Sequence, residues 1–116
     1  MPFPLLCAIH GGFYLLTGLW PLVHMPSFLA VTGPKTDLWL VRTVGALVVA
    51  MSIAFLVAMR EPSHASIVAL GIAAPAAFIA IDFVYVAKRT IGKVYLLDAL
   101  AEGILILGWL SHLLTR

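Results

Sequence analysis

The 116-residue chain is 63% hydrophobic and only 10% charged, with a mean hydropathy of +1.11. A soluble domain carries about 25% charged residues, so this composition excludes a protein covered by water and predicts a lipid environment. The net charge of +2 is too small and too scattered to indicate a nucleic-acid partner.

Four apolar stretches are long enough to cross a membrane, since a bilayer core of about 30 Å needs roughly 20 helical residues. They cover residues 5–24, 38–59, 65–87 and 94–114. The connections between them carry turn-forming proline and glycine and are too short to hold a soluble domain. We therefore expect an all-α fold, an integral membrane four-helix bundle that forms a single domain over residues 1–116.

Polar side chains in these stretches recur at three- and four-residue steps, which places them on one seam of each helix. The seam residues that are candidates for a functional site are His10, Tyr14, Arg42, Asp82, Tyr85, Asp98 and Glu102. This spacing favours left-handed packing at shallow crossing angles, with the polar seams facing the inside of the bundle.

The stretch "GIAAPAA", residues 71–77, gathers small side chains in the third helix. Small residues allow helices to approach closely in a membrane. We interpret this stretch as a close internal contact, with an oligomer seam or a hinge as the alternative.

Arg42, Asp82 and Asp98 lie at a similar depth from the same end of the bundle, and Glu102 lies one turn deeper. A carboxylate that faced lipid would cost several kcal/mol. We therefore predict that these acids face one another, with Arg42 as their counter-charge. Burial and a neighbouring like charge favour a neutral acid, and Glu102, the deepest, is predicted to hold a proton.

This cluster has two interpretations. It can be a structural pin that holds four helices together, because buried ion pairs often fix geometry. It can also be a site that handles a proton or a ligand, since Glu102 is an extra acid that a structural pair does not need. In that case His10, Tyr14 and Tyr85 are candidate relays.

Patterns for other chemistry are weak. Cys7 and His10 form C-x-x-H, a spacing that can offer two metal ligands, but packing is the preferred interpretation. We find no phosphate loop, nucleophile elbow or Ser/His/Asp arrangement. We therefore expect no catalytic residue, no metal site and no cofactor, and a membrane-embedded enzyme ranks third among the functional hypotheses.

The basic residues in the short connections predict the orientation in the membrane. The side of the first and third connections carries Lys35, Arg42, Lys88, Arg89 and Lys93, and the opposite side carries Arg60 and Arg116. This bias predicts a multi-pass protein of the cell membrane with both termini outside.

The motifs "GGFYLLTGLWPLVHMP", "WLVRTVGAL" and "YLLDALAEGILILGW" resemble those of small bacterial four-helix membrane proteins of the DoxX-like kind. The resemblance covers the whole chain in outline and implies a bacterial inner membrane. Some such proteins resemble accessory subunits of quinone-linked respiratory enzymes. The pattern assigns no functional residue.

The leading hypothesis is an integral membrane protein that binds or translocates a proton or small solute. Its site would comprise Arg42, Asp82, Asp98 and Glu102 with the candidate relays. The alternative is a non-catalytic accessory subunit of a larger respiratory or photosynthetic membrane complex. The expected partners are the lipid bilayer and either further copies of the chain or such a complex.

Overall fold

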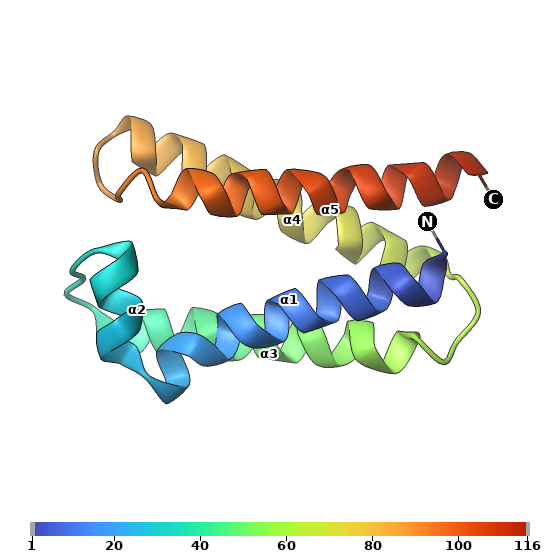
Figure 1. Cartoon of the computed structure of the whole chain (residues 1–116), viewed down its shortest axis with the longest axis horizontal. Coiled ribbons are helices and arrows are strands. Elements are labelled where there is room, and N and C mark those ends of the chain that lie inside the picture. The colour runs from blue at the N-terminus through green and yellow to red at the C-terminus, as the bar shows by residue number, and fades with distance from the viewer. Residues whose placement is uncertain (1, 116) are drawn as a thin grey trace.

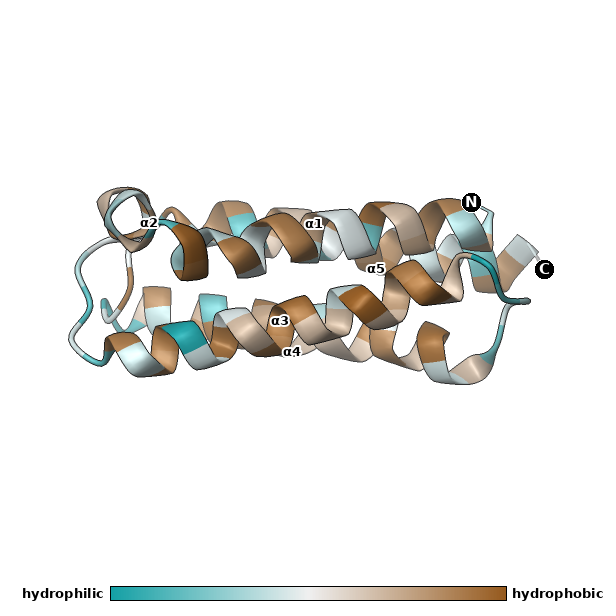
Figure 2. Cartoon of the chain, turned by 90° about the horizontal axis from the view of Figure 1, so that it is seen from below, coloured by the Kyte–Doolittle hydropathy of each residue, from teal (hydrophilic) through white to brown (hydrophobic). Residues whose placement is uncertain are grey.

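The computed structural model describes residues 2–115, which form five helices (Figure 1). These are α1 (Phe3–Val23), α2 (Met25–Thr32), α3 (Leu38–Ala58), α4 (Ala65–Ala87) and α5 (Tyr95–Thr115). All except α2 are long and apolar enough to cross a membrane. Figure 2 shows that hydrophobic residues run along these helices and that hydrophilic colour gathers mainly in the connections.

Both ends of each long helix lie within two residues of the predicted span. The first connection, for which only turn-forming residues were noted, contains a further helix, α2. The His24 side chain caps this helix by accepting a hydrogen bond from the backbone N–H of Ser27. Pro26 lies in its first turn, and Gly33 follows its end with a φ of 99°. Proline at the start and glycine just past the end are signals of a helix, so the sequence does contain signals for both ends of α2.

The long helices are arranged as two pairs, with α1 against α3 and α4 against α5. In the first pair, Gly18 and Gly45 bring the backbones together. A Cβ added at Gly18 would lie 2.8 Å from the carbonyl oxygen of Gly45, and one at Gly45 would lie 2.7 Å from that of Gly18. Both distances are too short for a real Cβ, so this crossing requires glycine on both helices.

The two pairs pack tightly against each other in the half of the molecule that holds the start of α1 and the end of α5. The buried side chains of this half include Phe3, Leu6, Phe55, Leu105 and Trp109. The Phe3 ring meets the Trp109 ring edge to face, with 5.8 Å between centroids. Gly71 makes room for Trp109, since a Cβ there would overlap the indole. The close contact predicted for residues 71–77 is therefore an internal one at Gly71.

Candidate functional site

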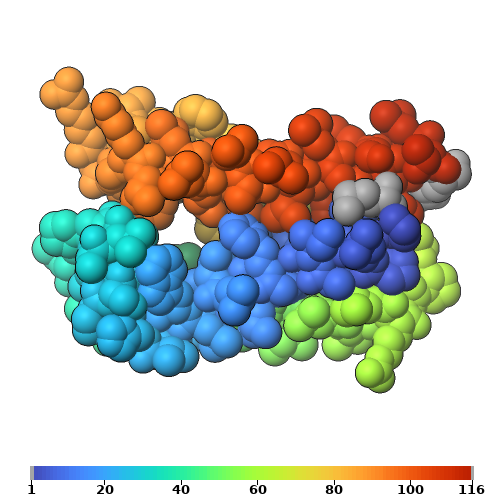
Figure 3. Space-filling view, in the orientation of Figure 1, coloured from blue at the N-terminus to red at the C-terminus, as the bar shows by residue number. Residues whose placement is uncertain are grey.

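The other half of the molecule is hollow. A cavity of about 360 Å³ lies between the two helix pairs, at the end that carries α2. Figure 3 shows the surface hollowed between the first part of α5 and the middle of α1. Most of the wall is aromatic or aliphatic, formed by Phe13, Tyr14, Phe28, Phe78, Tyr95, Leu40, Val41, Val44, Val48 and Ile81.

Three carboxyl groups line this mostly apolar cavity. Asp82 comes from α4, and Asp98 and Glu102 come from successive turns of α5. Asp82 is 3% exposed and Glu102 is 1% exposed, whereas Asp98 is half-buried. The structure therefore brings together the three acids that the sequence placed on inward seams.

The carboxyl groups are incompletely paired. Asp82 and Asp98 are close enough to share a hydrogen bond. Oδ2 of Asp82 and Oε1 of Glu102 are buried without a hydrogen-bond partner among the described residues. Buried polar atoms are nearly always hydrogen-bonded, so these two acids lack the full set of partners that buried carboxylates usually have.

Tyr14 links Glu102 to the packed half of the molecule. Its hydroxyl donates to Oε2 of Glu102 over 3.5 Å, and its ring meets the His10 imidazole edge to face with 4.3 Å between centroids. His10 is fully buried and lies outside the cavity lining. Its Nδ1 accepts a hydrogen bond from the indole N–H of Trp109 over 3.0 Å, so a neutral His10 carries its proton on Nε2, which has no described partner.

The cation at the cavity is Lys35, which the sequence analysis did not assign to the site. Among the described residues that line the cavity, Lys35 is the only one with a positive charge. It follows α2, so its position depends on the helix that the sequence analysis missed. The available signal was a basic residue two positions after the glycine that ends a helix, but its distance along the chain from the acids hid the connection.

Arg42 does not take the predicted role of counter-charge. It is exposed on α3 and does not line the cavity, although its neighbours Val41 and Val44 do. No ion pair joins it to a carboxylate within residues 2–115. The reason is the rotation of α3 about its axis. The close contact of Gly45 with Gly18 sets which face of α3 lies against α1, and Arg42 is not on the face that lines the cavity. A long side chain near a helix end can also extend to the membrane surface.

Tyr85, a predicted relay, likewise lies outside the site. Its side chain is exposed, and the Lys88 ammonium lies over its ring at 5.6 Å from the centroid. Tyr85 lies three residues after Asp82 on α4, but it is not among the residues that line the cavity. The structure therefore retains Tyr14 and His10 near the acids and separates Tyr85 from them.

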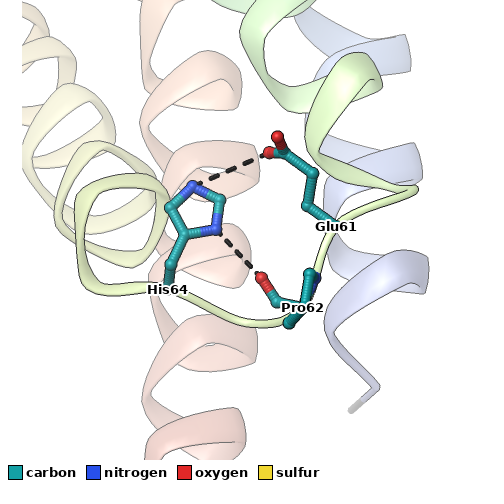
Figure 4. A network of polar contacts seen from close by, with 3 residues as sticks. All are labelled: Glu61, Pro62 and His64. Carbon is teal, nitrogen blue, oxygen red and sulfur yellow. Dashed lines mark hydrogen bonds and ion pairs between the residues drawn. The ribbon is translucent and has the colours of Figure 1, made fainter.

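A second polar group lies at the opposite end of the molecule. Nδ1 of His64 lies 3.0 Å from the Pro62 carbonyl oxygen, and its Nε2 lies 3.9 Å from Oε1 of Glu61 (Figure 4). Nearby, Nε2 of His112 and the Ser63 hydroxyl share a hydrogen bond of 2.9 Å. Across the described residues, no group of three His, Cys, Asp or Glu side chains is arranged to hold a metal ion.

No protein-family model matches the chain, and no curated protein or solved structure matches it. The functional argument therefore depends on the cavity and its side chains.

Proposed function

We propose that the chain is an integral membrane protein, and that its cavity binds a small solute in exchange with a proton carried by Glu102. The observation that carries this proposal is a mostly apolar cavity that gathers three carboxyl groups, two of them with a buried oxygen that has no hydrogen-bond partner within residues 2–115. Four helices of membrane-spanning length and composition support the lipid environment. The resemblance to DoxX-like proteins and the bacterial inner membrane remain part of this proposal.

The charges of the cavity favour a working site over a structural pin. The predicted pin needs Arg42 beside the acids, but Arg42 is exposed, and Lys35 is the only positive charge among the described lining residues. Three ionised acids in a low-dielectric cavity would repel one another strongly. A proton on Glu102 and one shared by Asp82 and Asp98 would leave a single negative charge, which matches Lys35.

Tyr14 gives Glu102 a route for proton exchange besides the cavity itself. Its hydroxyl already donates to Glu102, and its ring lies against His10. We therefore keep Tyr14 in the proposed proton path. His10 is left out because only a ring contact joins it to Tyr14, and Tyr85 because its exposed ring does not line the cavity.

The test is Glu102→Gln, which keeps the shape and hydrogen-bonding capacity of the side chain but removes its exchangeable proton. We expect the variant to fold, to lose a protonated-carboxyl band in infrared difference spectra at neutral pH, and to lose proton-linked solute movement in proteoliposomes. Glu61→Gln is the matched control, since Glu61 is an exposed glutamate in the α3–α4 connection.

Absence of the carboxyl band from the parent protein, or unfolding of Glu102→Gln, would refute the proposal and favour a structural role. The accessory-subunit alternative makes a different prediction. It requires stoichiometric co-elution with a large complex when the protein is purified from native membrane in mild detergent, whereas the solute site requires only this chain.

A further inference from the structure

The Lys35 ammonium lies in a small cage at the cavity. It is 5.2 Å from the ring centroid of Tyr95 and 5.3 Å from that of Phe28. It also donates to the Thr32 hydroxyl over 2.9 Å, to the Gly33 carbonyl over 3.1 Å and to the Thr32 carbonyl over 3.4 Å. Ring faces within about 6 Å attract cations, so the cavity contains a place built to hold an alkylammonium group.

We infer that the solute of this cavity is an organic cation with an apolar body, whose charged head replaces the Lys35 ammonium between Phe28 and Tyr95. This inference rests on the proposed function and adds the chemical class of the ligand. In the unliganded protein, the Lys35 ammonium itself lies between the two rings, and a cationic ligand competes with it for this position.

The charges that line the cavity favour a cationic ligand over an anionic or a neutral one. An anion would have to enter beside Asp82, Asp98 and Glu102, whose carboxyl groups supply acceptors where an anion needs donors. A neutral solute can fill the space but gains no cation–π attraction from the two ring faces. A cation gains attraction from both the rings and the acids.

The cavity also suits the body of such a ligand. Its volume of about 360 Å³ lies within the range of roughly 300–1,000 Å³ that is usual for small-molecule sites. Beyond the cage, the wall continues as Phe13, Val44, Val48 and Phe78. An aromatic or aliphatic body attached to the charged head would therefore be surrounded by apolar side chains while the head remains in the cage.

Lys35 can leave the cage without disturbing the helices. It lies between the end of α2 and the start of α3. Its hydrogen bonds within residues 2–115 join it to Gly33 and Thr32, two and three residues before it. Its flexible stem can carry the ammonium outward to water. Replacing Lys35 with glutamine removes the competing charge and leaves both rings and all three acids in place.

The experiment measures binding to the whole chain in lipid nanodiscs by equilibrium dialysis, with empty nanodiscs to subtract partitioning. The probes share one frame and differ in charge: radiolabelled benzyltrimethylammonium, its neutral carbon isostere neopentylbenzene, and the anion phenylacetate. We expect the cation to bind at least about tenfold more tightly than the neutral isostere and the anion not to bind.

Lys35→Gln should bind the cation about tenfold more tightly than the parent protein, and Tyr95→Leu about tenfold more weakly. Lys88→Gln and Tyr85→Leu are matched controls, because they remove a lysine–tyrosine pair that lies outside the cavity; both should leave the affinity unchanged. Circular dichroism checks that each variant is folded.

Binding of the neutral isostere or the anion as tightly as the cation would overturn this inference while leaving a solute site in place. Weaker cation binding by Lys35→Gln would overturn the replacement of Lys35. If no probe binds, the inference fails, and the infrared band of Glu102 then decides separately whether the proposed proton site stands.

Discussion

Arg42 lies four residues after the start of α3, exposed and apart from the acids that line the cavity. Surface substitutions away from buried networks usually change stability by less than about 0.5 kcal/mol. We therefore expect Arg42→Leu to unfold in detergent at the same temperature as the parent protein. Arg60→Leu, which changes another exposed arginine in the α3–α4 connection, is the control.

The opposite result has a clear meaning. If Arg42→Leu loses several kcal/mol of stability and Asp98→Asn recovers part of the loss, Arg42 is the counter-charge that the sequence pattern predicts. The exposed position of Arg42 argues against that result, because removal of an unpaired surface charge does not leave a buried acid without its partner.

At the scale of the element, the crossing of α1 and α3 depends on two glycines. Gly18→Ala would put a Cβ 2.8 Å from the Gly45 carbonyl oxygen. The helices would have to separate, and we expect a loss of about 1–3 kcal/mol of stability, which is typical of overpacking. Thermal unfolding in detergent, followed by circular dichroism, measures this loss.

Gly12→Ala is the matched control on the same helix, since a Cβ there meets nothing within 4 Å. Alanine is a better helix former than glycine by up to about 1 kcal/mol, so this variant should be as stable as the parent protein or more stable. Equal stability of Gly18→Ala and Gly12→Ala would mean that α1 and α3 do not approach as closely as the structure places them.

The elements also show what could be predicted from the sequence. The four long apolar helices could be predicted, because the length and composition of the apolar stretches are enough to identify them. The inward position of Asp82, Asp98 and Glu102 could also be predicted, since burying acids away from lipid leaves few alternatives. Arg42 could not be placed, because its direction depends on the rotation of α3, which is fixed by contacts such as Gly18 with Gly45 that lie far apart in the sequence. Tyr85 could not be placed either, because the spacing does not reveal that Lys88 lies over its ring.

At the scale of the whole molecule, tight packing and hollow space lie at opposite ends. The packed half holds the start of α1 and the end of α5, and the cavity lies at the end with α2. The cavity end also carries most of the basic residues, namely Lys35, Arg42, Lys88, Arg89 and Lys93. Basic connections favour the cytoplasmic side, so we propose that the cavity lies toward the cytoplasm.

Cysteine labelling in intact cells tests this orientation. Thr90 lies exposed in the connection before α5, at the cavity end, and Pro62 lies exposed in the α3–α4 connection at the other end. Pro62→Cys should react with a membrane-impermeant maleimide in intact cells, and Thr90→Cys only after permeabilisation. The parent protein is the control, because its Cys7 is fully buried. The reverse pattern would place the cavity toward the outside, and a solute would then reach the acids from the opposite side of the membrane.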